Sequence, residues 1–494
     1  MCGVTGVVLH NNSSGKKLID LLYLSIREIQ HRGYDGCGIA YLNSTSTHIN
    51  MIKNNTMIEP FFQTLFNSNL NDLDDLHSSS QIGIAHTRYK TIGPCTQSAS
   101  QPLLSPDHTL CLAHNGQIDV IDWFPDSGYI LDYMIKNLQI NNQVNHNDNI
   151  MIFEHVFRLV ENLMNNLVGS YSCVTLIANV GLVAFRDPRG IRPLILGKNA
   201  NNDYIVASES VCIDSIPGFS ILRDIQPGEC VIINPSTFLS KQLFYDNFDV
   251  NGGICTGSNS KAVTKHVINA RFTPCIFEYI YLASPRSIID GLSVEYARKY
   301  LGYLLAHHIN LNHADLKIDI VVPVPESSKI ATISIVERLN ELSDCLVEYV
   351  ELLELNSNRE KARSFILPTQ ELREEAVARK FILSDKYDLT GKNILIVDDS
   401  IIRGTTLRHI VAKIRSGSKC NKIYVASVAP PIINHNIYGI DIPDCKLLIA
   451  YNRSNDQIAN EIGADLVIYQ KLNSMLELFA LISPTANSFE HTMF

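Results

Sequence analysis

Short apolar runs separated by polar turns occur throughout the first half of the chain, and they predict β-strands. These runs lie at 4–9, 82–85, 110–113, 171–177 and 181–185. Two longer stretches, 18–29 and 150–167, instead space their apolar residues as one face of a helix. The pattern therefore predicts a fold of strands with few, well-separated helices.

The second half has a different pattern, in which apolar runs typical of strands alternate with segments of helical periodicity. Strands are predicted at 318–324, 394–397 and 423–428, and a helix is predicted at 294–302. Such alternation is typical of a parallel α/β sheet, whose ligands bind at the carboxyl ends of the strands. Residues 246–262 carry little apolar pattern and are predicted to connect the halves.

Composition narrows the function classes. A chain of 494 residues is too long for one core, and its mean hydropathy of +0.04 suits a globular protein. A net charge of -9 argues against a nucleic-acid partner. No apolar run approaches a membrane span and no signal peptide is visible, so no membrane partner is expected. The twelve cysteines form no Cys-x-x-Cys pair, which favours a reducing, cytoplasmic location.

The strand at 394–397 ends in two adjacent carboxylates, Asp398 and Asp399. Such a pair repels phosphate but binds ribose hydroxyls, or a divalent metal that carries a pyrophosphate. An ordinary acidic turn is the alternative for the pair taken alone. The residues that follow make the ligand-binding interpretation the stronger one.

A glycine and two hydroxyl residues come next, at Gly404, Thr405 and Thr406, and a helical pattern opens at Leu407. Glycine permits close backbone approach, and the N–H groups of a helix start favour an anion. The run lacks the Walker pattern but resembles the 5-phosphoribosyl-1-pyrophosphate (PRPP) motif of type I phosphoribosyltransferases. By this resemblance the PRPP-binding residues of the loop are Asp398, Asp399, Ser400, Arg403, Gly404, Thr405 and Thr406.

The chain begins with Met1 and Cys2. Removal of Met1 would give Cys2 a free α-amino group, whose pKa of about 7.7–8.0 suits it to accept the thiol proton. A cysteine that merely happens to be second and buried is the alternative. The choice depends on the motifs downstream.

Three motifs downstream of Cys2 resemble those of N-terminal-nucleophile glutamine amidotransferases; they begin at His31, His86 and His114. The resemblance covers about the first 235 residues and implies an αββα sandwich of the class II glutaminase type. It implies that Cys2 is the nucleophile, and that the Asn115 side-chain amide and the Gly116 N–H form the oxyanion hole.

The same resemblance assigns the glutamine-binding residues. Arg88 would hold the substrate α-carboxylate, for which a bidentate guanidinium is suited, and Arg32 would support that pocket. Asp126 would hold the substrate ammonium group. Its neighbour Gly128 departs from the family, which has a serine–aspartate–serine–glutamate stretch there.

Further runs resemble one family, amidophosphoribosyltransferase, which opens purine synthesis. They lie at 206–210, 223–229, 274–281 and 438–443, while the turn-rich run 185–194 is predicted to be structural. The predicted domains are a glutaminase at 2–235, a connection at 236–273, a phosphoribosyltransferase at 274–475 and a tail at 476–494.

The family resemblance implies formation of 5-phosphoribosylamine, diphosphate and glutamate from PRPP, L-glutamine and water. It implies Mg2+ held by Ser328, Asp398 and Asp399, and a loop carrying Arg363 and Gln370 that closes over PRPP. It also implies a homo-oligomer, typically a homotetramer, with purine nucleotides as effectors.

Two alternatives stay open. Gly128 and Ser357, the latter where the family has lysine, would support a catalytically weakened regulatory or scaffold homologue. Other glutaminases, such as glucosamine-6-phosphate synthase or asparagine synthetase, share the first half but lack the loop at 398–406, so they rank lower.

Overall fold

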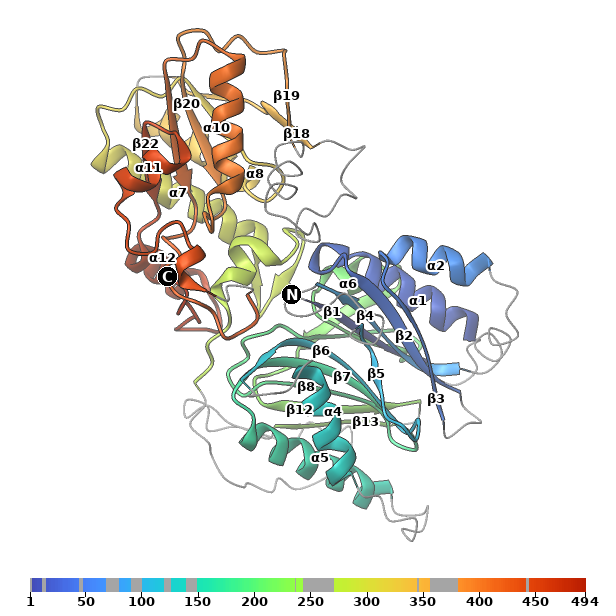
Figure 1. The fold of residues 1–494 in the computed structure, drawn as a ribbon. Coiled ribbons are helices and arrows are strands. Elements are labelled where there is room, and N and C mark those ends of the chain that lie inside the picture. The colour runs from blue at the N-terminus through green and yellow to red at the C-terminus, as the bar shows by residue number, and fades with distance from the viewer. Residues whose placement is uncertain are drawn as a thin grey trace.

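The computed structural model contains two packed halves, drawn in Figure 1 from blue to green and from yellow to red. It describes residues 2–10, 15–43, 48–67, 80–89, 100–119, 126–138, 149–235, 237–242, 271–343, 346–355, 381–440 and 444–494. The N-terminal end of the chain lies where the halves meet (Figure 1). A residue at position 2 is therefore next to both halves.

Two antiparallel sheets form the first half. The larger sheet has the order β11 (Phe219–Asp224), β9 (Ile195–Asn199), β10 (Tyr204–Ala207), β1 (Gly3–Val8), β4 (Ser80–Arg88), β2 (Gly36–Asn43) and β3 (Ile49–Asn54). The smaller sheet has the order β13 (Thr237–Gln242), β12 (Glu229–Asn234), β8 (Gly181–Arg186), β7 (Gly169–Ile177), β6 (Leu110–Ile118) and β5 (Leu103–Leu104).

Helices cover the outer face of each sheet. α1 (Gly15–Arg27) packs on β1 and β4, and α2 (Ile58–Asn67) packs on β2. α4 (Asp126–Asn137) packs on β6, and α5 (Asn149–Asn166) packs on β12. The short elements η1 (Gln30–Arg32) and α6 (Val211–Asp214) complete this half. Every residue of β1 is buried, because helices cover one face and the other sheet covers the second. The predicted αββα sandwich is confirmed.

A parallel sheet forms the second half, in the order β17 (Glu348–Tyr349), β16 (Ile320–Pro323), β20 (Asn393–Asp398), β21 (Lys422–Ser427) and β22 (Leu466–Tyr469). Its helices are α7 (Val294–Asn312), α8 (Lys329–Leu342), α10 (Thr405–Gly417), α11 (Asn455–Ile462) and α12 (Leu472–Ile482). Smaller elements are η3 (Glu278–Leu282), β14 (Ile288–Ile289), β15 (Leu292–Ser293), β18 (Leu353–Leu355), β19 (Phe381–Leu383) and η4 (Cys445–Leu447). The predicted parallel α/β sheet is confirmed.

Two predicted boundaries differ from the structure. The first half continues past residue 235, because β13 pairs along its length with β12. The segment 476–494, predicted as a C-terminal tail, packs on the second half through Phe489, whose ring contacts Tyr279 and Phe479. Phe489 and Met493 are buried, and Glu490 forms a bridge with Cys275. Apolar residues near the C-terminus therefore complete the core between the halves.

In the part of the chain that the structure describes, no helix combines the length and the apolar character that a membrane crossing requires.

Candidate active sites

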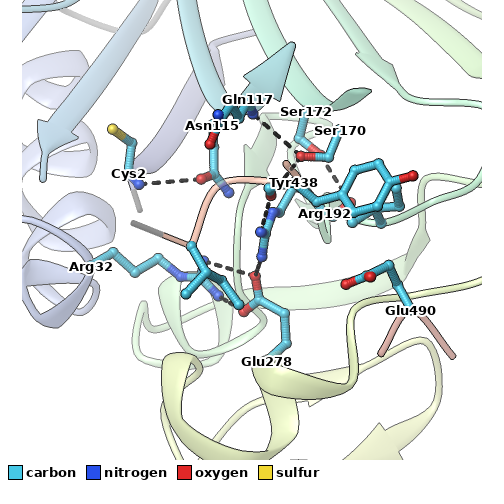
Figure 2. A network of polar contacts seen from close by, with 12 residues as sticks. Cys2, Arg32, Asn115, Gln117, Ser170, Ser172, Arg192, Glu278, Tyr438 and Glu490 are labelled. Carbon is cyan, nitrogen blue, oxygen red and sulfur yellow. Dashed lines mark hydrogen bonds and ion pairs between the residues drawn. The ribbon is translucent and has the colours of Figure 1, made fainter. Parts of the chain in front are cut away.

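The two sheets of the first half meet at Cys2 and Asn115. Cys2 directly precedes β1 of the larger sheet, and Asn115 lies on β6 of the smaller sheet. The Cys2 backbone N–H donates to Asn115 Oδ1 at 3.2 Å (Figure 2). Asn115 is fully buried, and its Nδ2 has no acceptor among the described residues. An unpaired buried donor is costly, so an amide held open beside a thiol fits a donor reserved for a substrate oxygen.

Gly116 follows Asn115 with a φ of +149°, which glycine adopts readily and other residues rarely do. A Cβ at this position would lie 2.0 Å from the carbonyl oxygen of Ser170 on the neighbouring strand β7. Close approach of β6 to β7 therefore requires glycine here. In the predicted oxyanion-hole pair, burial restricts the Asn115 side chain, and the close approach of β7 restricts position 116 to glycine.

Arg88 ends β4, one residue beyond the point where Thr87 pairs with Gly3 of β1, so it lies across from Cys2. Its side chain is buried, and Nη1 has no acceptor among the described residues. Gly33 packs on its backbone: a Cβ on Gly33 would lie 2.4 Å from Arg88 C. Asp35 N also donates to Arg88 O at 2.8 Å. The motif that begins at His31 therefore packs on the motif that begins at His86 and holds Arg88 in place. A buried guanidinium with a free donor suits a carboxylate ligand.

Asp126 is the first residue of α4, and its Oδ2 accepts from Ile118 N at 3.2 Å. It therefore lies at the end of the strand that carries Asn115 and Gly116. His114, on the same strand, has its pKa lowered by burial, although the Asp126 charge acts in the opposite direction. Its ring is neutral near pH 7 and adds no positive charge beside the site.

Arg32 is fully buried between two carboxylates. Its Nε donates to Glu209 Oε1, and its Nη2 lies 2.5 Å from Glu278 Oε2. Burial opposes the charge, but Glu209 and Glu278 outweigh it and raise the pKa of Arg32. These contacts are internal, so any support that Arg32 gives to a glutamine pocket acts through its neighbours.

The acid pair lies at the carboxyl end of β20. Asp399 Oδ1 accepts from Ser400 Oγ at 2.6 Å, and Asp399 Oδ2 accepts from Ser327 Oγ. Ser327 reaches the pair because β16 and β20 are parallel neighbours, so the loops that follow them share one edge of the sheet. Ser328, the serine predicted from the sequence, is buried and donates to Val324 O at 2.7 Å. Its hydroxyl therefore points into the protein, and Ser327 is the serine at the pair.

Gly404 has a φ of +71° and is the N-cap residue that precedes α10, and a Cβ there would lie 2.3 Å from Ile449 Cδ1. Thr405 and Thr406 open the helix, and Arg403 is exposed beside them. The helix start therefore has its N–H groups and two hydroxyls at the same sheet edge as the acid pair. This combination suits a ligand with a phosphate and hydroxyls. Arg363, Gln370 and Ser357 lie outside the described residues.

No group of three or more His, Cys, Asp or Glu side chains that could hold a metal occurs among the described residues. The available donors are the two carboxylates and the Ser327 hydroxyl, all of them oxygen. Mg2+ prefers oxygen ligands and commonly uses one or two carboxylates, with waters and substrate phosphates for the rest. The donor set therefore fits Mg2+ bound together with a phosphorylated substrate.

Buried ion pairs join the two halves. Arg192 Nη1 lies 3.0 Å from Glu278 Oε1, so Glu278 of η3 holds both Arg192 and Arg32 (Figure 2). Arg186 makes two bonds to Asp290, of 2.7 and 2.8 Å. The run 185–194 was predicted to be structural, and its arginines form this junction. The many arginines among turn residues in this run were the sequence signal for a structural role. No local pattern indicated the contacts that Glu278, Ser327 and Tyr438 make with distant residues.

Comparisons with known proteins agree with this geometry. Residues 51–269 match the model of a glutamine amidotransferase domain. The chain is 35% identical to the amidophosphoribosyltransferase of Schizosaccharomyces pombe, over 97% of this chain and 86% of that one. It is 33% identical to the enzyme of that name from Escherichia coli, over 100% and 92%.

Two solved structures are similar over nearly the whole chain. One is the PRPP amidotransferase from B. subtilis complexed with ADP and GMP, with a TM-score of 0.70, 27% identity and coverage of 100% and 99%. The other is described as the allosteric regulatory enzyme of purine biosynthesis, with a TM-score of 0.72, 29% identity and coverage of 98% and 93%.

Proposed function

The chain belongs to the amidophosphoribosyltransferase family, and we propose that it forms 5-phosphoribosylamine, diphosphate and glutamate from PRPP, glutamine and water. The observation that carries this proposal is the presence, in one chain, of the Cys2–Asn115 pair and of the acid-pair loop at the end of β20. A glutaminase alone would need no such loop, and a phosphoribosyltransferase alone would need no such cysteine.

In the first half, Cys2 Sγ attacks the glutamine carboxamide carbon. Once Met1 is removed, the Cys2 nitrogen becomes an α-amino group that accepts the thiol proton and passes it to the leaving ammonia. Asn115 Nδ2 and Gly116 N–H donate to the oxyanion, and the open Asn115 donor supports this role. Arg88 holds the α-carboxylate, and Asp126 holds the ammonium group. Water then releases glutamate from the thioester.

In the second half, ammonia attacks C1 of PRPP and diphosphate leaves. Asp398, Asp399 and Ser327 would hold Mg2+, which neutralises charge on the leaving diphosphate when bound. Thr405, Thr406 and the start of α10 hold the 5-phosphate end, and Gly404 lets the backbone approach it. Closure of the loop that carries Arg363 and Gln370 stays a prediction from the sequence.

Ammonia must pass between the sites inside the protein, because in bulk water near pH 7 it is protonated and no longer nucleophilic. The buried contacts between the halves support such a coupling. We also propose purine nucleotides as effectors, since the B. subtilis relative was solved with ADP and GMP. Homotetrameric assembly and a cytoplasmic location stay predictions from the sequence.

The test is PRPP-dependent diphosphate release by purified protein with magnesium, comparing glutamine with ammonium chloride as nitrogen donor. We expect activity with both donors. Cys2→Ala should abolish the glutamine reaction and keep the ammonia reaction, because only the first site needs the thiol. Cys420→Ala, which removes a partly exposed cysteine of the second half, is the matched control.

Release with neither donor would refute the proposed function and favour a regulatory homologue. Activity with ammonia alone in the unmutated protein would mean that the altered stretch around Asp126 and Gly128 has cost the glutaminase its activity.

A further inference from the structure

A turn of the second half lies directly against the predicted oxyanion hole of the first. Tyr438 O accepts a hydrogen bond from Ser170 Oγ at 2.8 Å (Figure 2). Gly439 has a φ of +101°, and a Cβ there would lie 3.3 Å from Gly116 C and 3.2 Å from Arg192 Nη2. The turn therefore packs closely on the backbone of Gly116, and a Cβ at position 439 would fit only if its neighbours shifted by a few tenths of an ångström.

Ser170 connects the turn to the peptide that follows Gly116. Its Oγ donates to Tyr438 O in the second half and accepts from Gln117 N at 3.3 Å in the first. The Ser170 hydroxyl thus binds the Gly116–Gln117 peptide of the first half and Tyr438 of the second half at the same time. Glycine has more backbone freedom than any other residue type, and Gly116 has a positive φ. Contacts from other residues are therefore needed to hold the Gly116 N–H in one orientation.

The turn itself is braced from three sides. Asn436 Oδ1 accepts from Tyr438 N at 2.9 Å and from Ile440 N at 3.3 Å. Asn436 Nδ2 donates to Glu490 Oε2 at 3.4 Å, in the C-terminal segment that packs into the junction. Arg192 Nη2 donates to Tyr438 O. The turn is therefore a rigid support, because its peptide groups and both ends of Asn436 are engaged.

We propose that the Tyr438–Gly439 turn is a positioning element for the oxyanion hole, and that the phosphoribosyltransferase half thereby sets the rate of glutamine hydrolysis. The inference rests on the proposed function, since it assumes that Asn115 and Gly116 stabilise the oxyanion. The oxyanion exists only along the reaction path. Loosening the turn should therefore lower kcat for glutamine and leave glutamine KM, Cys2 reactivity and the ammonia reaction unchanged.

The first variant is Ser170→Ala, which deletes the link between turn and strand without adding volume. We expect kcat for glutamine hydrolysis to fall roughly five- to tenfold, the usual worth of one neutral hydrogen bond. Ser25→Ala is the matched control. Ser25 is equally buried, its hydroxyl also makes two hydrogen bonds, and both bonds stay within the first half.

The second variant is Gly439→Ala, which presses a methyl group toward Gly116 C. We expect a fall in kcat between about tenfold and the roughly 100-fold seen when an oxyanion donor is removed. Gly218→Ala is its control, because Gly218 also has a φ beyond the usual left-handed region, of +84°, but a Cβ there meets nothing within 4 Å. It carries the same kind of backbone strain without the contact.

Each protein is assayed for glutamine KM and kcat, for the ammonia reaction, and for the rate at which iodoacetamide alkylates Cys2, followed by mass spectrometry. A loss confined to kcat for glutamine supports the proposal. An unchanged kcat in both variants, or an equal loss in the ammonia reaction, would overturn it. Lack of glutamine hydrolysis by the unmutated protein would instead refute the proposed function, and this inference with it.

Discussion

Replacing Glu278 with alanine should destabilise the junction between the halves by about 3–5 kcal/mol, the usual cost of removing one partner of a buried ion pair. Glu278 Oε2 lies 2.5 Å from Arg32 and Oε1 lies 3.0 Å from Arg192, and both arginine side chains are fully buried. Arg32 would keep Glu209, but Arg192 would have no carboxylate partner among the described residues. The magnitude therefore corresponds to one orphaned charge and not to two.

Urea unfolding followed by circular dichroism measures the loss. Because a chain of this length can unfold in steps, hydrogen exchange of the amides in η3 and β6 should report the local value. Glu278→Gln should lose less than the alanine variant, because an amide oxygen can still accept from one arginine. Glu341→Ala is the surface control: Glu341 pairs with Arg338 at 2.7 Å but is 59% exposed, so its loss should stay below about 1 kcal/mol.

A loss of stability in Glu278→Ala no larger than that in Glu341→Ala would contradict this prediction. That result would mean that water enters the junction and solvates Arg192, so that burial adds nothing to the pair. A large loss in the alanine variant with full recovery in Glu278→Gln would also count against it, because hydrogen bonding alone would then account for the effect.

Two further predictions concern pH dependence and substrate affinity. Burial, followed by repulsion from Asp290, raises the pKa of Asp224 to about 6. Its ionisation therefore costs stability as pH rises from about 4, its unfolded pKa, through about 6. Asp224→Asn should remove that slope and stabilise the protein at pH 7 by roughly 1–3 kcal/mol, and an unchanged slope in urea titrations at several pH values would contradict this. Arg88→Lys should raise glutamine KM by roughly 10- to 100-fold, since a bidentate charged contact is lost; steady-state kinetics test it, the ammonia reaction is the control, and an unchanged KM would exclude Arg88 from the carboxylate site.

Local patterns along the chain are enough to predict much of the architecture and, through the family resemblance, most of the candidate chemistry. Apolar periodicity predicted the strand at 394–397 and the helix at 18–29, because burial of one face imposes that spacing in any context. Gly404 could also be interpreted locally, as a residue that lets the backbone approach a ligand. It has a positive φ, a conformation that backbone sterics leave open mainly to glycine. Boundaries are harder to predict: the sequence places the end of the first half at residue 235, whereas the structure extends it through β13, which pairs with β12.

Which residues face one another becomes clear only once the chain is folded. Ser327 and Ser328 are adjacent in sequence and chemically identical, and the path of the chain after β16 turns the first toward Asp399 and the second inward. Arg32 is predicted to support the glutamine pocket, and the carboxylates that hold it, Glu209 and Glu278, come from distant positions in the chain. A motif specifies residue types within a few positions, whereas the partner of a buried charge or hydroxyl can come from anywhere in the chain. Contacts between the halves therefore follow from packing and not from local spacing.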